Sequence, residues 1–464
     1  MKKMMLAFAI LFQASFAFAQ TLSADLLQRD LTFLQEAIYR GHPDVFRYTT
    51  KDSFDAFFNQ IRESVKAVST PNEAYFPINQ CLSKIGCGHT VAYPLPVNDS
   101  ALVLPIRFAF AENKIVVLEN LSDDSTIQVG SEILSINGHP ISEIWENLRD
   151  QRPSDGFNQT FKEVLFTRSF MSQFETIYGK TKTYYLIIRN QTGESTQYKI
   201  KAITYKERTA RIKEIKINYA LILKQKSAIL YFAKENSTVG VFKISDFNGK
   251  SSFYKTVFDT LEKRKTENLI IDLRGNLGGD ITNMAKLLSY LLNEKFGYTM
   301  ARNRFNMGKY NTFGSKLMRL MIFLKHDTGL YKKHKEGNRN IYEINENSSK
   351  LHHFQGKIFV LTDAFTFSAA SMCASFLKNK GHATVVGTET SGGEASNNGR
   401  GGFKIELPNS KIVVNIPNFH LDYGLIKDNG RGVIPNYETP QTVANIIARK
   451  DLAMEKVLEL IRNK

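Results

Sequence analysis

The spacing of apolar residues changes twice along the chain, and each change marks a different kind of predicted structure. Between residue 20 and about residue 80, apolar side chains recur every three or four positions, which predicts helices. The segment LSADLLQRDLTFLQEAIYRG places its main apolar residues on one helical face: Leu26, Leu27, Leu31, Leu34 and Ile38. Gly41 ends that pattern, and SFDAFFNQIRESVKAV repeats it. We expect an N-terminal helical domain over residues 20–98.

From about residue 99 to residue 205, short β-rich segments replace the helical pattern. LPIRFAF, KIVVLEN, SEILSING and TYYLIIRN are bounded by Gly, Asn, Asp or Pro, which predicts strands. Within VGSEILSINGHPISEIWENL, a strand, an Asn137-Gly138 turn, a second strand and a helix follow one another. This order resembles a PDZ domain, a fold whose sheet edge accepts an extended peptide. Because LPIRFAF lacks an adjacent glycine-rich loop, a packing module that binds no peptide is the alternative.

From about residue 225 onward, continuous apolar strands alternate with helical segments. The predicted strands are SAILYF, VGVFKI, NLIIDL, KIFVLT and ATVVG, and the predicted helices are FYKTVFDTLEKR, DITNMAKLLSYLL and SAASMCASFLKNKG. Strands that are apolar on both faces are typical of a largely parallel sheet covered by helices. We therefore expect an α/β domain over residues 206–464. A basic segment at about 296–350 interrupts it and is predicted to be an insertion that acts as a lid or contact surface.

The composition is that of a folded globular protein. The 464 residues are 42% hydrophobic and 23% charged, which argues against long disorder, collagen or a coiled coil. No internal apolar run approaches the roughly 20 residues that a membrane-spanning helix needs. The formal net charge is +16, but charges of both signs are mixed along the chain. This favours solubility or attraction to anionic surfaces over a nucleic-acid site.

The N-terminus has the three parts of a secretory signal. MKKMMLAFAILFQASFAFAQ begins with two lysines, continues with a short apolar run and ends in Ala17-Phe18-Ala19. We expect residues 1–19 to be a signal peptide and the mature chain to be periplasmic or extracellular, with an uncut N-terminal anchor as the alternative.

The cysteines are too few for a disulfide framework. There are three, Cys81, Cys87 and Cys373, in a chain of 464 residues. Cys81 and Cys87 are close enough in sequence for a local disulfide. Cys373 lies in an apolar helical run and is predicted to be a buried thiol.

Two segments of the last domain carry candidate chemistry. In LIIDLRGNLGGD, a buried strand enters a glycine-containing turn, and a helix begins at Asp280. Amides at such a turn favour negative charge, so Gly278 or Gly279 is a candidate oxyanion donor. The spacing matches no phosphate-binding motif, and a purely structural turn is the alternative.

The second segment is KIFVLTDAFTFSAASMCASFLKNKG, where Ser368 stands at the start of an apolar helix. Ser368 is either a helix N-cap or a nucleophile. In the second case, the amide of Ala369 can join an oxyanion hole.

Together these segments resemble the S41 serine peptidases, the tail-specific or C-terminal-processing proteases. The resemblance rests on DLRGNLGG, FSAAS and VVGTETSGG, covers about residues 225–445, and extends to GRGVIPNY. It implies a ClpP/crotonase-like α/β catalytic domain, and a PDZ-like domain ahead of that domain is common in the family. It also implies that Ser368 is the nucleophile and that Gly278 and Ala369 line the oxyanion hole.

The general base departs from the Ser–Lys branch of that family. This branch places its lysine about 25 residues beyond the serine, where this chain reads Gly392-Gly393-Glu394-Ala395-Ser396. The tricorn-like and nisin-resistance-like branch instead takes its base from a G-H-[ST] turn, which LSKIGCGHTVAYP resembles. The resemblance implies that His89 is the base. A turn histidine bonded to the backbone is the alternative.

A third group is expected to orient His89. The same branch uses a partner near its G-V-x-P motif, and KDNGRGVIPNY offers Asp428. Asp422 and Glu394 are alternatives, and each of the three acids is also compatible with a solvated surface position. The spacing of Cys81, Cys87 and His89 fits no zinc pattern, so we expect neither a metal ion nor a cofactor.

The sequence therefore predicts an exported serine-type endopeptidase that acts on a peptide or an unfolded protein and binds no nucleic acid. One rival is a catalytically inactive peptide- or ligand-binding protein on the same scaffold. Another uses the basic insertion for peripheral membrane contact. The oligomeric state is left open.

Overall fold

The computed structural model describes residues 22–66, 71–93, 99–149, 153–212, 219–233, 238–303, 332–346 and 353–463. The predicted signal peptide and about half of the predicted insertion lie outside these residues. None of the described helices is long and apolar enough to cross a membrane.

The N-terminal region contains the predicted helices. They are α1 (Ala24–Gly41), α2 (Lys51–Ser64) and α3 (Pro71–Ser83). Ser23 and Thr50 cap the first two, because their side-chain oxygens accept the backbone N–H groups of Leu26 and Ser53. The apolar face of α1 is buried as the spacing predicts, with Leu27, Leu31 and Leu34 fully inaccessible to solvent.

The second region is a small antiparallel sheet with two helices packed against it. The sheet order is β3-β4-β5-β7-β8, and β6 pairs with β5. Its elements are β3 (Ile106–Ala111), β4 (Lys114–Asn120), β5 (Glu132–Ile136), β6 (His139–Pro140), α4 (Ile141–Arg149), α5 (Thr160–Tyr178), β7 (Thr183–Arg189) and β8 (Ser195–Lys201). Asn137 and Gly138 have φ angles of 51° and 84°, as a two-residue hairpin turn requires. The helix α5 was not predicted from the sequence.

Two short strands and a short helix complete this region. The strands β2 (Leu102–Val103) and β9 (Ile203–Thr204) pair antiparallel, and α6 (Tyr205–Arg211) follows them. Thr204 and Glu207 form a capping box at the start of α6, each satisfying a backbone N–H of the other.

The third region is built on a seven-stranded sheet in the order β10-β11-β12-β13-β17-β18-β21. The strands from β12 to β21 run parallel to their neighbours, whereas β10 and β11 form an antiparallel edge. The strands are β10 (Tyr219–Gln225), β11 (Ala228–Ala233), β12 (Val239–Ile244), β13 (Asn268–Asp272), β17 (Lys357–Thr362), β18 (Thr384–Gly387) and β21 (Tyr437–Glu438).

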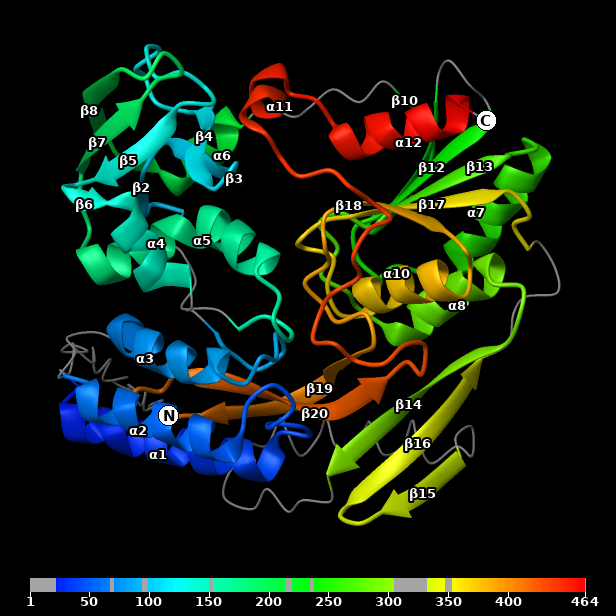
Figure 1. The fold of residues 1–464 in the computed structure, drawn as a ribbon, viewed down its shortest axis with the longest axis horizontal. Helices are drawn as coiled ribbons and strands as arrows, with labels where there is room; N and C mark the ends of the chain where they lie inside the picture. The colour runs from blue at the N-terminus through cyan, green and yellow to red at the C-terminus, as the bar shows by residue number, and fades with distance from the viewer. Residues whose placement is uncertain are drawn as a thin grey trace, which may run out of the picture.

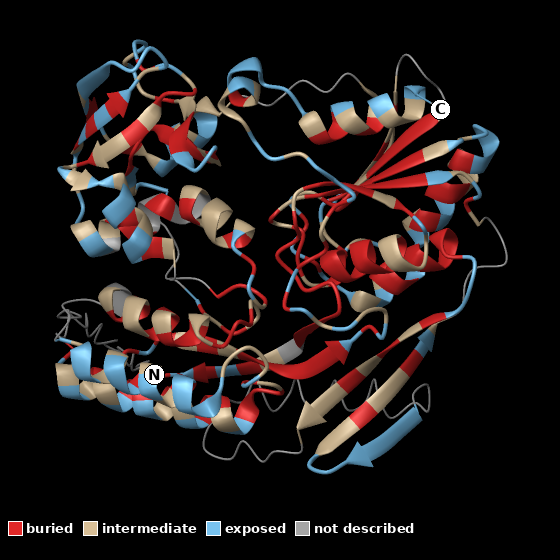
Figure 2. Cartoon of the chain, viewed as in Figure 1, coloured by how far each residue is buried: buried red, intermediate tan, exposed pale blue. Residues whose placement is uncertain are grey.

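Helices cover both faces of this sheet (Figure 1). They are α7 (Ser252–Lys263), α8 (Ile281–Leu291) and α10 (Ala369–Asn379) on one face and α12 (Leu452–Arg462) on the other. Along β13, Leu269 and Ile271 face the first group, while Ile270 packs towards α12. The central strands are therefore almost wholly buried (Figure 2), which explains their continuous apolar sequence.

A second, antiparallel sheet combines a strand from the N-terminal region with strands from the last domain. Its order is β1-β20-β14-β16-β15, and β19 also pairs with β20. The strands are β1 (Val91–Ala92), β14 (Phe296–Asn303), β15 (Lys332–Glu336), β16 (Arg339–Glu346), β19 (Ser396–Glu406) and β20 (Val413–Asp422). The described part of the predicted insertion thus forms strands in this sheet.

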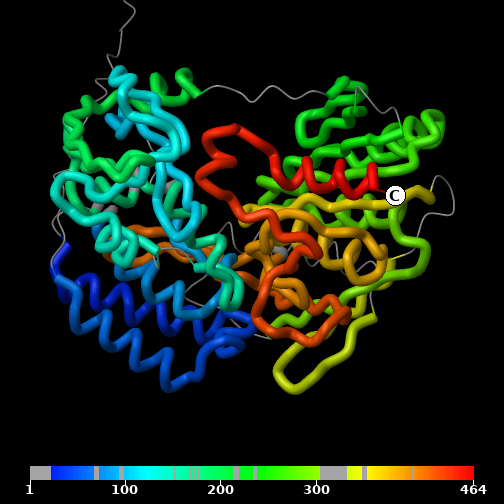
Figure 3. Tube along the Cα trace, turned by 45° about the horizontal axis from the view of Figure 1, so that its top comes forward, coloured from blue at the N-terminus to red at the C-terminus, as the bar shows by residue number. Residues whose placement is uncertain are grey.

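The β19–β20 hairpin extends to the N-terminal helices (Figures 1 and 3) and, in the view of Figure 1, runs between α3 and the pair α1 and α2. Phe403, Val414 and Ile416 of the hairpin share one core with Leu31 and Phe58 of the helices. A short C-terminal helix, α11 (Val443–Ala448), packs through Ile446 on Val116 of β4. The N-terminal helices are therefore held beside the large sheet by residues that come more than 300 positions later.

All three cysteines are buried and free. A Cys81–Cys87 disulfide, which the sequence left open, does not form, whereas the prediction of a buried Cys373 thiol is confirmed.

Candidate active site

Ser368 lies in a strained turn between β17 and α10. Its backbone angles are φ 53° and ψ −124°, a combination that side-chain-bearing residues rarely adopt. Although it occupies the N-cap position of α10, its side chain makes no capping hydrogen bond. The Ser368 Oγ instead lies 3.0 Å from the Nε2 of His89. This position in the structure disfavours the simple N-cap interpretation.

His89 reaches Ser368 because the β19–β20 hairpin and a phenylalanine hold its segment in place. Asn415 Nδ2 on β20 donates a 2.8 Å hydrogen bond to the backbone carbonyl of His89. The imidazole packs on the ring of Phe367, with ring centroids 4.5 Å apart. The two predicted residues, 279 positions apart in sequence, thus lie within hydrogen-bond distance.

The imidazole of His89 is partly buried, and loss of hydration makes it a neutral group. Burial lowers the pKa of His89 to about 4, because the charged form loses its hydration. The Nδ1 atom is buried and has no hydrogen-bond partner among the described residues. At neutral pH the ring is therefore uncharged and has one nitrogen that can accept a proton.

The glycine turn of residues 275–279 packs directly against Ser368. A Cβ atom added to Gly278, whose φ is 105°, would lie 2.8 Å from the Cβ of Ser368. The backbone N–H of Gly278 already donates to Asn276 Oδ1 at 2.8 Å, and its carbonyl accepts from Phe247.

Within the described residues, the amides of Gly279 and Ala369 have no hydrogen-bond acceptor. Of the three predicted oxyanion donors, these two therefore have their N–H groups available.

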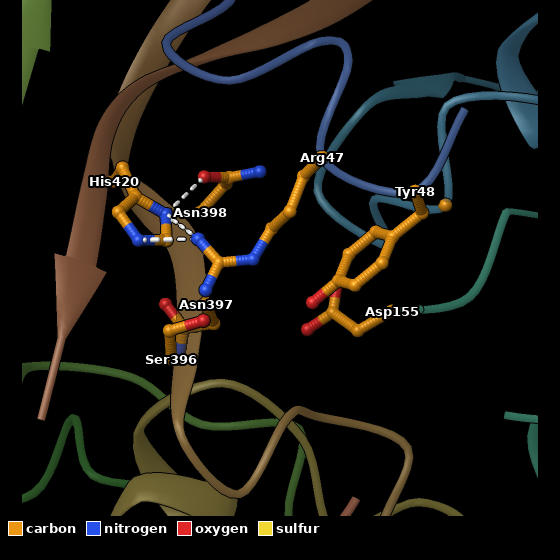
Figure 4. A pocket seen from close by; sticks show the side chains of 8 residues that line it. Arg47, Tyr48, Asp155, Ser396, Asn397, Asn398 and His420 are labelled. Carbon is orange, nitrogen blue, oxygen red and sulfur yellow. Dashed lines mark hydrogen bonds between the residues drawn. The ribbon is translucent and has the colours of Figure 1, made fainter. Parts of the chain in front are cut away.

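Asp428, predicted as the third catalytic group, is held by Arg47 and Tyr48, which also line the pocket that contains Asp155. Its carboxylate pairs with Arg47 and accepts hydrogen bonds from Tyr48 Oη and the Gly430 amide. Burial alone would raise the pKa of Asp428, but the Gly430 amide and Arg47 lower it overall. Arg47 also contacts His420, which lies beside Asn398 (Figure 4). Within the described residues, no contact joins Asp428 to His89.

The two alternative acids also have other partners. Glu394 pairs with Lys378, with Oε1 and Nζ 2.9 Å apart, while Asp422 Oδ1 accepts the Gly424 amide. Lys378 also donates to the carbonyl of Ile434. Lys378 is thus held in a structural ion pair, as the departure from the Ser–Lys pattern suggests.

Asp155 is the carboxylate that lies beside His89, and the sequence analysis missed it. Ligand atoms of Cys87, His89 and Asp155 all lie within 4.8 Å of one another. Asp155 Oδ1 accepts the Gly88 amide at 2.7 Å, whereas Oδ2 is buried and has no hydrogen-bond partner in the part of the chain that the structure describes. Burial, opposed by the amides of Gly88 and Gly393, raises the pKa of Asp155 to about 7. Asp155 lies in the loop between α4 and α5, outside every motif that we identified, so no sequence signal pointed to it.

Comparison with known proteins agrees with this architecture. Residues 238–436 match the model of peptidase family S41, and residues 100–215 match a PDZ domain model. The carboxy-terminal processing protease CtpB of Bacillus subtilis (strain 168) is 26% identical over 222 residues. That alignment covers 47% of this chain but only 38% of CtpB.

Two solved structures resemble nearly the whole chain. Mature CPAF complexed with lactacystin superposes with a TM-score of 0.65 at 14% identity, covering 95% of this chain and 99% of CPAF. A second structure of mature CPAF gives a TM-score of 0.64 at 15% identity, covering 95% and 98% of the two chains. At such low identity, this likeness shows the fold.

The fold and the family matches define a mixed α/β protein with N-terminal helices, a PDZ domain and a peptidase domain. The domain over residues 238–436 matches peptidase family S41, and the domain that precedes it matches a PDZ domain.

Proposed function

We propose that this protein is an exported serine-type endopeptidase in which Ser368 is the nucleophile and His89 is the general base. The main support is the 3.0 Å separation of Ser368 Oγ and His89 Nε2, which lies within the range expected of a nucleophile and its base. The strained backbone of Ser368 adds to this support, since strained residues cluster at active sites.

The proposed reaction follows from these positions. His89 Nε2 accepts the hydroxyl proton as Ser368 Oγ attacks the peptide carbonyl. The resulting imidazolium then protonates the leaving amine, and the acyl group stays on Ser368 as an ester. A water molecule, activated by His89 in the same way, hydrolyses that ester and restores the free serine. A partly buried imidazole of low basicity is uncharged at neutral pH, so nearly every molecule can begin this cycle.

The tetrahedral intermediate carries a negative oxygen that needs hydrogen-bond donors. We assign this role to the amides of Ala369 and Gly279, because both are without an acceptor and flank the contact between Ser368 and the glycine turn. Gly278 then serves mainly by its missing side chain, which lets the turn approach Ser368. Losing one donor amide raises the activation barrier by about 3–4 kcal/mol in comparable sites.

Asp155 is our candidate for the residue that positions His89. Both Asp155 Oδ2 and His89 Nδ1 are buried without partners, and the two side chains are close neighbours. A small rotation would let Nδ1–H donate to Oδ2 and fix the tautomer that leaves Nε2 free to accept a proton. Asp428 is the alternative that the sequence favoured.

Substitutions separate these two acids. In Asp155→Asn the amide oxygen can still accept the Gly88 N–H, so the change tests mainly the charge. We expect a fall in kcat on the order of 10²–10⁴ with little change in KM, and partial recovery in Asp155→Glu. In Asp428→Asn, kcat should fall much less. The opposite ranking of these two variants would reassign the role to Asp428.

The proposed nucleophile is tested by a fluorophosphonate probe and by hydrolysis of an unfolded protein. Ser368 should be labelled in the wild type, and labelling should be lost in Ser368→Ala and strongly reduced in His89→Ala. Hydrolysis should be abolished in both variants. Ser375→Ala, in the same helix, is the control. The Ser375 hydroxyl already donates to the Glu394 carbonyl and lies outside the proposed site, so its loss should not remove the labelling. Full hydrolysis by Ser368→Ala would refute the assignment.

The substrate class and the location rest on separate support. The S41 and PDZ domains favour a peptide or unfolded protein substrate. Export rests on the N-terminal sequence alone. Mass spectrometry of the secreted or periplasmic protein should find a mature N-terminus at Gln20, and an intact N-terminus on protein retained in the cytoplasm would contradict export.

A further inference from the structure

Cys87 is a second polar group beside His89 for which the proposed reaction has no use. Its thiol is buried, only 1% exposed, and burial with the nearby Asp155 raises the pKa of Cys87 to about 12. Together with His89 and Asp155, it places sulfur, nitrogen and oxygen ligand atoms within 4.8 Å of one another. A thiol, an imidazole and a carboxylate are the three ligand types that zinc prefers in proteins.

Two of these three groups have unused ligand atoms. His89 Nε2 is occupied by Ser368, so Nδ1 is the nitrogen that is left, and it is buried without a partner. Asp155 Oδ1 is occupied by the Gly88 amide, and Oδ2 is likewise buried without a partner. Buried polar atoms without partners are uncommon in proteins. Two of them on neighbouring side chains, among the described residues, mark a site where a cation could bind.

We propose that Cys87, His89 and Asp155 form a binding site for Zn²⁺ and that the bound ion reversibly inhibits the peptidase. Ligands of a tetrahedral zinc lie about 3.3–3.7 Å apart, given bond lengths of about 2.0–2.3 Å. Since the ligand atoms lie within 4.8 Å of one another, the three side chains need to close in by at most about 1.5 Å. A water molecule would take the fourth position, as in other sites with three protein ligands.

Inhibition follows from the proton positions. On binding, the Cys87 thiol gives its proton to solvent and coordinates as a thiolate. A neutral imidazole that coordinates through Nδ1 carries its single proton on Nε2. This nitrogen then donates to Ser368 Oγ and can no longer accept the serine proton. The ion thus takes the place that the Nδ1 proton holds in the proposed active state.

The inhibition rests on the proposed function, whereas ion binding does not, so the two are measured separately. Binding is measured by titrating the full chain carrying Ser368→Ala with Co²⁺, which reports a thiolate ligand through a sulfur-to-cobalt charge-transfer band. We expect one equivalent of Co²⁺ to produce the band and Zn²⁺ to displace it. The band should vanish when Cys87→Ser is added and persist with Cys81→Ser, which removes a buried thiol outside the site.

Inhibition is measured on the chain with Ser368 intact, in buffers that fix the free Zn²⁺ concentration. Zn²⁺ should inhibit hydrolysis, and a chelator should restore it. In Cys87→Ser, the inhibition constant, measured against that variant's own metal-free rate, should rise by at least about tenfold, because even outer-sphere partners contribute 10–100-fold to metal affinity. If Cys87→Ser does not fold, Asp155→Asn in the Ser368→Ala chain provides the binding test.

The outcomes are distinct. Absence of the cobalt band, or a band that survives loss of Cys87, overturns the proposed site. Zinc inhibition that is equal in the wild type and Cys87→Ser places the inhibitory ion elsewhere and also overturns it. A chain that binds Co²⁺ through Cys87 but hydrolyses nothing supports the metal site and refutes the proposed function instead.

Discussion

Replacing Ser368 by glycine is expected to give a more stable protein than replacing it by alanine, although both changes remove the proposed nucleophile. The reason is the backbone of residue 368, whose φ of 53° and ψ of −124° suit glycine and strain any residue with a Cβ atom. Such strain costs about 1–3 kcal/mol. Glycine also has more conformational entropy than alanine in the unfolded chain, and this cancels about 0.4–1 kcal/mol of the stability that relief of strain provides.

The net gain for glycine over alanine is therefore about 1 kcal/mol. For a domain of this size, that difference raises the Tm by about 2–4 °C. Differential scanning calorimetry of Ser368→Gly and Ser368→Ala measures the shift directly, since neither variant has the serine hydroxyl and both lack its contact with His89.

Ser371 provides the matched control. It lies one turn further along α10 in ordinary helical backbone, where glycine is less stable than alanine by about 0.5–1 kcal/mol. The Ala-to-Gly difference should thus change sign between positions 368 and 371. If glycine is the less stable residue at both positions, the turn at Ser368 is not strained, and the argument that links its backbone to catalysis fails.

Three further changes test other parts of the structure. Gly278→Ala should lower kcat at least about 100-fold with an unchanged circular dichroism spectrum, because the new Cβ would lie 2.8 Å from the Cβ of Ser368; near-normal turnover would show that the turn can withdraw. Asp30→Ala should cost at least about 2 kcal/mol in urea unfolding, because the buried carboxylate accepts backbone N–H groups of both Asn409 and Ser410; a loss below half of that would mean that water replaces it. Asp428 has a lowered pKa in the folded protein, so its contribution to stability is present above pH about 4 and lost as the pH falls through the folded value. Asp428→Asn should therefore lower the Tm at pH 7, and a Tm difference that does not shrink as the pH is lowered below about 4 would contradict this linkage.

Local patterns were sufficient for most of the secondary structure. The 3.6-residue period of α1 and the continuous apolar strands β12, β13 and β17 were visible because each reflects burial along one element. The Asn137-Gly138 turn was visible because few residue pairs adopt its angles. The helix α5 was missed, although Phe166, Phe170 and Phe174 follow one another at intervals of four.

The candidate site was predictable only where its residues lie in family motifs. Ser368 and the glycines of the DLRGNLGG turn were found in this way, and His89 was found through its Gly-His-Thr turn. Asp155 belongs to no motif. It became a candidate because its Oδ2 and the Nδ1 of His89 lack hydrogen-bond partners among the described residues and because Cys87 lies nearby. Such properties depend on what surrounds a side chain, which a linear pattern does not contain.

The sequence alone determined most of the order of the elements, the type of each domain, and which serine and histidine are the candidates for catalysis. Whether those two side chains meet was decided by tertiary structure. Asn415 on the long β19–β20 hairpin bonds the backbone of His89, and the hairpin packs on the N-terminal helices, so that His89 lies beside the large sheet. The partners of each carboxylate were decided in the same way, since Arg47 holds Asp428 while Asp155 is buried beside the imidazole. Local sequence sets backbone preferences over a few residues, whereas these contacts join residues that lie up to 381 positions apart.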